Sequence, residues 1–143
     1  MATRRGLLFS GKNPFPIRII AGPCQHEHFA DSLEIAETCK EIVEDFGGEY
    51  IFKASFDKAN RTHRESERGL GIHKTLSDFW KLKNEMGDLK ILTDVHEQWQ
   101  VDLIENNFHD AVDVYQIPAF LSRQTDLILA ACHTEKSVNI KKG

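Results

Sequence analysis

The stretch 50-YIFKAS-55 decides the fold class, because a short run rich in aromatic and β-branched residues passes directly into polar side chains. A run of this length and composition is typical of a buried β-strand. Further short apolar runs of the same kind recur along the chain, at positions 18–21, 91–94, 112–116 and 138–141. The sequence therefore predicts a sheet of about five strands.

Segments with the apolar spacing of helices separate these runs. The clearest lies at 33–46 and stops at Gly47-Gly48, and others are predicted at 75–86, about 97–106 and 125–132. Thr125 or Asp126 is expected to cap the last helix. Trp80 and Trp99 are expected to pack against the sheet. Strands that alternate with helices predict a parallel sheet of right-handed βαβ units, either in an open doubly wound sheet or in part of a barrel.

Polar residues follow every predicted strand at its C-terminal end. They are Cys24, Lys53 with Ser55, Asp94 with His96, Gln116, and Lys141 with Lys142. An eight-stranded TIM barrel builds its active site at this face, so the pattern favours an α/β fold of the (β/α)8 type. Five strands and four helices make only a partial barrel. We therefore expect residues 1–143 to be the N-terminal portion of a single aldolase-type barrel domain, with residues 1–17 as an extension.

The composition fits one globular domain, with 41% hydrophobic and 28% charged residues. A net charge of -4 gives no general attraction to nucleic acid or to an anionic membrane. The three cysteines are odd in number and too scattered for a disulfide framework, which favours a reducing compartment. The sequence shows neither a signal-peptide core nor an apolar stretch of membrane length. We predict a cytoplasmic protein without nucleic-acid or membrane partners.

The segment 52-FKASFDKANR-61 carries the most specific motif. It resembles the signature of the KDO-8-phosphate synthases at ten successive positions. Further blocks resemble that family in the same order, namely AGPC at 21–24, LTDVHE at 92–97, QIPAFL with RQTDL within 116–127, and VNIKKG at 138–143. The resemblance implies a (β/α)8 transferase of lipopolysaccharide biosynthesis that condenses phosphoenolpyruvate with arabinose 5-phosphate to give KDO 8-phosphate and phosphate.

Phosphoenolpyruvate carries a carboxylate and a phosphate, so its pocket needs several fixed cations and hydrogen-bond donors. The alternative for lysines is a solvated surface, but a lysine that ends a buried parallel strand is badly placed for it. The resemblance implies that phosphoenolpyruvate is held by Lys53, Ser55, Lys58, Gln116 and Lys141, with backbone contact from Ala119. Lys53 and Lys58 are among the expected catalytic residues.

The residues after Lys58 carry the prediction about the acceptor sugar. The resemblance implies that Asn60, Arg61 and Thr62 bind arabinose 5-phosphate, with Arg61 meeting the phosphate as a bidentate fork. The segment 62-THRESERGLG-71 departs from the family's SSIHSFRGPG, which leaves the acceptor open.

Three further side chains have less specific roles. Asp94 and His96 are expected to be catalytic, because a carboxylate can bind sugar hydroxyls and an imidazole can orient a substrate or water. The alternative for His96 is a hydrogen-bonded loop histidine. Arg123 either faces a neighbouring subunit's site or caps the helix near Thr125.

Cys24 resembles the metal ligand of the metal-dependent branch of the family, which implies a divalent Zn, Fe or Mn ion. The alternative is a small core cysteine. His26 and His28 stand beside it, but their spacing fits no standard zinc site, and we exclude them. The family's other ligands are a His, a Glu and an Asp of the second half, so Cys24 is not expected to hold a metal tightly by itself.

Three hypotheses follow. The first is the initial half of a KDO-8-phosphate synthase, inactive alone. The second is a related phosphoenolpyruvate-condensing synthase, such as a DAHP synthase, with another aldehyde acceptor. The third is a non-catalytic half-barrel. An unpaired fifth strand predicts association with other copies or with a complementary half, and the resemblance implies a homotetramer.

Overall fold

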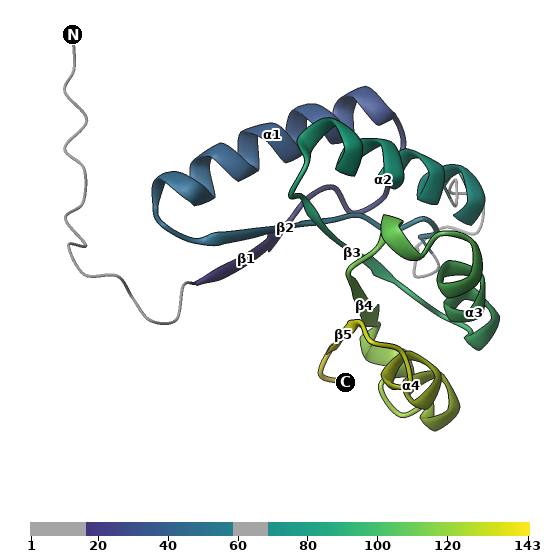
Figure 1. Ribbon diagram of the computed structural model, residues 1–143. Helices are drawn as coiled ribbons and strands as arrows, with labels where there is room; N and C mark the ends of the chain where they lie inside the picture. The colour runs from purple at the N-terminus through teal and green to yellow at the C-terminus, as the bar shows by residue number, and fades with distance from the viewer. Residues whose placement is uncertain (1–16, 59–68) are drawn as a thin grey trace, which may run out of the picture.

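The computed structural model describes residues 17–58 and 69–143. The strands are β1 (Arg18–Ala21), β2 (Glu49–Lys53), β3 (Lys90–Asp94), β4 (Val114–Ile117) and β5 (Ser137–Ile140). The helices are α1 (Phe29–Asp45), α2 (Ile72–Met86), α3 (Gln98–Asn107) and α4 (Thr125–Cys132), with 3-10 turns η1 (His109–Ala111) and η2 (Ala119–Leu121). Figure 1 shows their arrangement.

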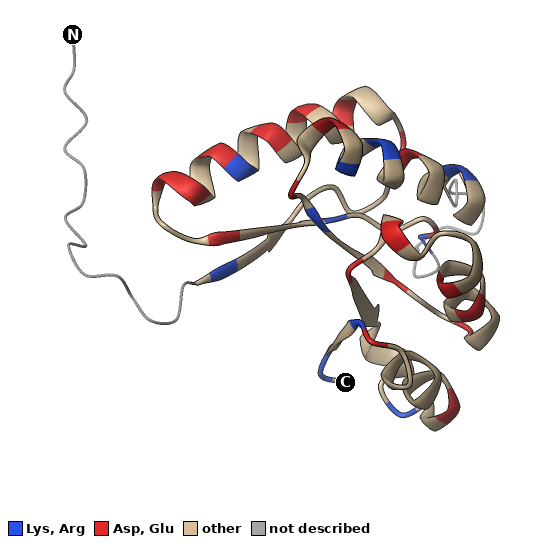
Figure 2. Cartoon of the chain, in the orientation of Figure 1, with Lys and Arg blue, Asp and Glu red and all other residues tan. Residues whose placement is uncertain are grey.

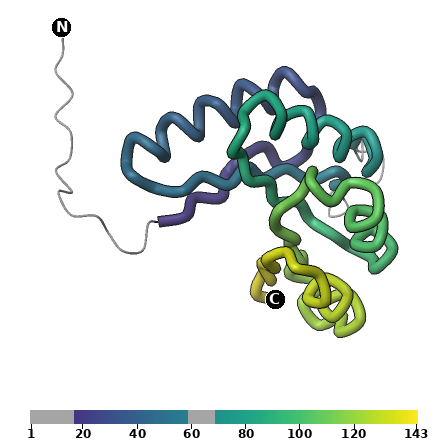
Figure 3. The backbone as a smooth tube through the Cα atoms, in the orientation of Figure 1, coloured from purple at the N-terminus to yellow at the C-terminus, as the bar shows by residue number. Residues whose placement is uncertain are grey.

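The five strands form one parallel sheet in the order β1-β2-β3-β4-β5. A doubly wound sheet reverses its strand order at a switch point, whereas a barrel adds each strand beside the preceding one. The sheet curls as strands are added, and the helices lie on its convex side (Figures 1 and 3). The fold is a partial (β/α) barrel of five strands and four helices, which confirms the predicted fold class and excludes the open sheet.

The main core lies between the helices and the convex face of the sheet. Phe52, Ile91 and Tyr115 of the strands meet Leu76 and Phe79 of α2 there, and all five are fully buried. Successive side chains of a strand point to opposite faces, so the residues between these strand positions face the concave side. That side carries the polar strand ends described below.

The two outer strands are much less covered. Ile19 and Ile20 of β1 are 40% and 42% exposed, and Ile140 of β5 is 46% exposed. Within residues 17–58 and 69–143, β1 and β5 each pair with one strand only. The described part of the chain therefore presents two open edges.

Two predictions about helix residues are wrong. The structure starts α4 at Thr125 and gives its N-cap, Gln124, no side-chain cap hydrogen bond. Neither Thr125 nor Asp126 is the cap, because both lie inside the helix. Trp80 and Trp99 are 52% and 50% exposed and do not lie in the core. On α2 the buried stripe includes Phe79, and the next residue is turned by about 100° away from it.

A close backbone approach aligns β1 with β2 beyond the ends of both strands. A Cβ at Gly22 would lie 2.1 Å from the carbonyl oxygen of Lys53, so only glycine fits there. The amide of Ser55 then donates to Cys24 O at 3.3 Å, and the amide of His26 donates to Ser55 O at 3.0 Å. These bonds fix the segment that carries Cys24 beside Ser55.

None of the helices within the described residues combines the length and the apolar character that crossing a membrane requires.

Candidate functional site

Asp94 is the centre of a polar cluster at the C-terminal ends of the strands. Ser55 Oγ donates to its Oδ2 and Gln116 Nε2 donates to its Oδ1. Lys53 Nζ lies 3.4 Å from Asp94 Oδ2 and 3.5 Å from Ser55 Oγ. The side chains of Lys53 and Asp94 are only 22% and 12% exposed, so this ion pair is partly shielded from water. The structure thus brings four of the predicted site residues together.

Strand register accounts for the cluster. Asp94 pairs with Gln116 across β3 and β4, and Gln116 pairs with Asn139 across β4 and β5. Direct partners in neighbouring strands face the same side of a sheet, so the three side chains form a row. Asn139 Nδ2 donates to Gln116 Oε1 at 2.9 Å and closes the row.

Asn139 was missed by the sequence predictions. The signal that identifies it is the strand period of two, because it lies two positions before the predicted site residue Lys141.

Cys24 and Lys58 lie together at a second position. Both line a pocket of about 250 Å³ that also includes Gln25, Asp31 and Ser32. Cys24 is an exposed free thiol, so the alternative that it is a small core residue is wrong. The pocket joins the segment after β1 to the segment after β2, next to Ser55. The predicted metal ligand Cys24 and the predicted phosphoenolpyruvate residue Lys58 therefore line the same pocket.

The backbone amide of His96 has a hydrogen-bond partner among the described residues, whereas its ring Nδ1 has none. Its amide donates to Gln100 Oε1 at 2.7 Å, and the same oxygen accepts from the amide of Glu97 in the capping box of α3. The ring lies edge-to-face with Phe56, with 5.9 Å between ring centroids. Its Nδ1 is buried and has no hydrogen-bond partner among the described residues. The cap therefore orders the loop, and the imidazole retains a free polar atom beside Phe56.

Ala119, Arg123 and Lys141 lie at the same edge but are not part of the Asp94 cluster. Lys141 N donates to Ile117 O at 3.0 Å, which extends the β4–β5 ladder past the end of β5. A Cβ at Gly143 would lie 2.9 Å from Ala119 O, so the terminal segment passes close to η2. Arg123 and Lys141 are exposed, and their side chains bond to no residue within 17–58 and 69–143. Asn60, Arg61 and Thr62 lie outside the described residues.

His26 lies in a buried network of hydrogen bonds. Its Nδ1 lies 2.8 Å from Ser32 Oγ, its Nε2 lies 3.2 Å from Asp78 Oδ2, and all three side chains are buried. Burial disfavours ionised Asp78, but hydrogen bonds from Lys74, His26 and Lys81 outweigh it and hold the pKa of this carboxyl below its ordinary value. Both ring nitrogens are thus engaged by the protein.

The donor set around Cys24 does not fit a metal ion by itself. Within the described part of the chain, no three or more His, Cys, Asp or Glu side chains group in a way that could hold one. A catalytic zinc site takes about three protein ligands. A metal held at Cys24 therefore needs ligands from other residues.

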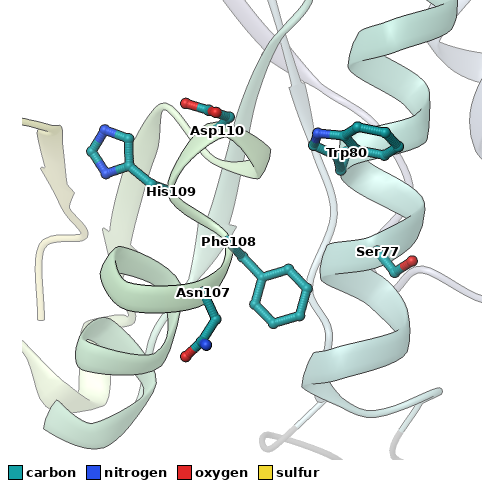
Figure 4. Close-up of a pocket in the computed structure, with 6 residues that line it drawn as sticks. All are labelled: Ser77, Trp80, Asn107, Phe108, His109 and Asp110. Atoms are coloured by element: carbon teal, nitrogen blue, oxygen red, sulfur yellow. The ribbon is translucent and has the colours of Figure 1, made fainter.

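Two further pockets lie away from these strand ends. One of about 320 Å³ lies between α2 and the α3–η1 junction, where Figure 4 shows Trp80 and Phe108 on opposite sides of the space. Another of about 320 Å³ is lined by residues that include Lys83 and Asp113, which pair at 2.8 Å.

Figure 2 shows acidic residues repeated along α1. Positive charge for an anionic ligand must therefore be local, as it is at Lys53.

Comparison with known proteins identifies the family. Residues 7–143 match the model of the DAHP synthetase I family. The 2-dehydro-3-deoxyphosphooctonate aldolase of Rhodopseudomonas palustris (strain TIE-1) is 50% identical over 131 residues, which cover 92% of this chain and 44% of that protein. Proteins of the same name from Chelativorans sp. (strain BNC1) and Nitrobacter hamburgensis are 48% and 52% identical, over 92% and 90% of this chain and 46% and 43% of theirs.

That name is a synonym of KDO-8-phosphate synthase, so the resemblance seen in the sequence is confirmed. The chain spans less than half the length of these curated relatives. Because the family model covers nearly the whole sequence, the chain belongs to the DAHP synthetase I family.

Proposed function

We propose that this chain forms the first half of a KDO-8-phosphate synthase and binds phosphoenolpyruvate at the C-terminal ends of its strands. One observation carries the proposal. Lys53, Ser55, Asp94 and Gln116 come from three separate sequence blocks and converge in one hydrogen-bonded cluster. Barrel enzymes build their active sites at this face. The names of the relatives support the same assignment.

The proposed reaction joins carbon 3 of phosphoenolpyruvate to the aldehyde carbon of arabinose 5-phosphate. Water adds at carbon 2, and the bond between carbon 2 and the phosphate oxygen breaks to release phosphate. No electron acceptor is needed, because the oxidation and reduction balance within the two substrates. In this proposal, Lys53, Lys58 and Lys141 position the two anionic substrates and stabilise their charge.

Asp94 and His96 are proposed to face the acceptor aldehyde. The buried Nδ1 of His96 has no partner among the residues that the structure describes, which supports this role, because such a polar atom costs free energy unless a ligand or water engages it. Asn60, Arg61 and Thr62 are proposed to hold the sugar phosphate. Ala119 offers backbone contact to phosphoenolpyruvate. For Arg123 we propose contact with the site of a neighbouring copy, in keeping with its exposed side chain.

We propose a divalent Zn, Fe or Mn ion only where residues outside this chain supply the other ligands. Cys24 supplies one ligand, and the His, Glu and Asp that the resemblance implies are assigned to the second half. Relatives more than twice as long support a complementary half. We also propose that the complete enzyme is a homotetramer, as the resemblance implies. The three free cysteines agree with the proposed cytoplasmic location.

Phosphate release tests the proposal. The chain is incubated with phosphoenolpyruvate, arabinose 5-phosphate and added divalent metal, alone and with the C-terminal half of a curated relative. We expect no turnover alone and turnover after complementation, abolished by Lys53→Met. Phosphate release by the chain alone would contradict our account of the missing half.

The acceptor is tested in the same assay, because the segment 62–71 departs from the family pattern. A panel of phosphorylated aldoses of different length replaces arabinose 5-phosphate in the complemented enzyme. Preference for another aldose would favour a related phosphoenolpyruvate-condensing synthase instead.

A further inference from the structure

Asn139 lies outside every role that the sequence motifs assign, yet it is the last member of the hydrogen-bond row that ends on Asp94. Its Nδ2 donates to Gln116 Oε1 at 2.9 Å, and Gln116 Nε2 donates in turn to Asp94 Oδ1. The three residues are direct partners in the register of β3, β4 and β5. The bonds therefore run straight across three strands.

The direction of these bonds is fixed by chemistry. An ionised carboxylate only accepts hydrogen bonds, so Gln116 must turn its NH₂ group toward Asp94 and its carbonyl toward β5. That carbonyl needs a donor, and Asn139 Nδ2 supplies it. We infer that Asn139 is a positioning residue that keeps the Gln116 amide in this direction.

The inference rests on the proposed function and explains how the same site tolerates an anion. A bare carboxylate would repel phosphoenolpyruvate at the strand ends. Asp94 is covered on Oδ1 by Gln116 and on Oδ2 by Ser55, with Lys53 beside it. The Gln116 NH₂ group has two N–H donors, and Asp94 uses one of them. No residue within 17–58 and 69–143 accepts the other, which can serve the ligand.

A reversed Gln116 amide would undo both effects. Its carbonyl oxygen would face the Asp94 carboxylate, and the N–H donors would turn away from the site. The identity of residue 139 thus decides whether the strand ends attract or repel an anion. A side chain of the same shape as Asn139 but without a donor should be worse than an apolar one.

Two substitutions separate polarity from packing. Asn139→Asp keeps the shape and places a second acceptor against Gln116 Oε1, whereas Asn139→Leu keeps a similar volume and removes polarity. Ser137→Ala is the matched control, because Ser137 is exposed on the same strand. The side-chain ¹⁵N–¹H signals of Gln116, identified by their loss in Gln116→Glu, report the amide without any ligand. Calorimetry with phosphoenolpyruvate reports the anion site.

We expect Asn139→Asp to shift the Gln116 signals, speed their exchange and weaken phosphoenolpyruvate binding by about tenfold or more. Asn139→Leu should change the Gln116 signals and the affinity for phosphoenolpyruvate less, and Ser137→Ala should leave both unchanged. Gln116 signals unchanged in Asn139→Asp would overturn the inference, as would shifted signals with unchanged affinity. If Asn139→Asp fails to fold by circular dichroism, Asn139→Leu carries the test. A wild-type chain that binds no phosphoenolpyruvate contradicts the proposed function, while the amide signals still decide the direction of the bond.

Discussion

His26 and Asp78 lie 52 positions apart in sequence and are bonded inside the protein, with 3.2 Å between His26 Nε2 and Asp78 Oδ2. The bond ties the segment after β1, which carries Cys24, to helix α2. Removing one partner of a buried pair leaves the other without compensation and typically costs about 3–5 kcal/mol. We expect Asp78→Ala to lower the free energy of unfolding by roughly 3 kcal/mol in urea denaturation.

The matched control is Asp88→Ala, which removes the exposed partner of Lys40. An exposed ion pair contributes little to stability, so this variant should unfold close to the wild type. Equal destabilisation by the two substitutions would contradict a special role for the buried pair.

The same carboxyl predicts a dependence of stability on acid. The pKa of Asp78 is held below its ordinary value of 3.8 by Lys74, His26 and Lys81, which together outweigh burial. A group with a lowered folded pKa contributes full stability above its unfolded pKa and loses it as pH falls through the folded value. The difference in unfolding free energy between wild type and Asp78→Asn should therefore be constant above about pH 5 and shrink below pH 4. A difference that grows toward low pH would refute this assignment.

The two tyrosines predict the behaviour in alkali. Burial raises the pKa of Tyr50 and of Tyr115 above the ordinary value of 10.0, with a further contribution from Glu105 beside Tyr115. Since the chain has no other tyrosine, tyrosinate absorbance should not appear near pH 10 in the folded protein. It should rise only together with loss of circular dichroism at higher pH, because the unfolded chain then releases protons that the folded chain keeps. In urea both should titrate near pH 10.

The open edges predict association. Ile140 on β5 and Ile19 on β1 are partly exposed at the two outer strands. Unpaired strand edges with apolar side chains favour pairing with another chain. In sedimentation velocity we expect the chain to form oligomers and Ile140→Lys to shift it toward monomer. Ile42→Lys on α1, at a residue 52% exposed, should not do so. A monodisperse wild-type monomer with a cooperative melt would count against this account.

Periodicity was enough to predict the number and order of the elements, but not their limits. The run predicted at 112–116 overlaps a strand that the structure places at Val114–Ile117. Asp113 precedes this strand, and its carboxylate accepts hydrogen bonds from Ile91 N and from Lys83. Local sequence does not show such long-range partners, which compete with strand propensity.

In the candidate site, too, local sequence predicts some residues, whereas others depend on tertiary pairing. Lys53, Asp94 and Gln116 could be named from motifs because each lies at or next to the C-terminal end of a strand. The role of Asn139 depends on the register between β4 and β5, and register is set by tertiary pairing. The sequence likewise excludes His26 as a ligand, but its buried bond to the distant Asp78 could not be predicted from local sequence.

The central claim is that the C-terminal strand ends bind phosphoenolpyruvate, and calorimetric titration of this chain tests it directly. Lys53→Met removes the cation beside Asp94, while Lys90→Met removes an exposed lysine at the opposite end of the neighbouring strand β3. A hydrogen bond to a charged group is worth about 1.5–3 kcal/mol, so Lys53→Met should weaken binding roughly ten- to a hundredfold and Lys90→Met should leave it unchanged. Equal affinities for both variants, or no binding by the wild type, would contradict the claim.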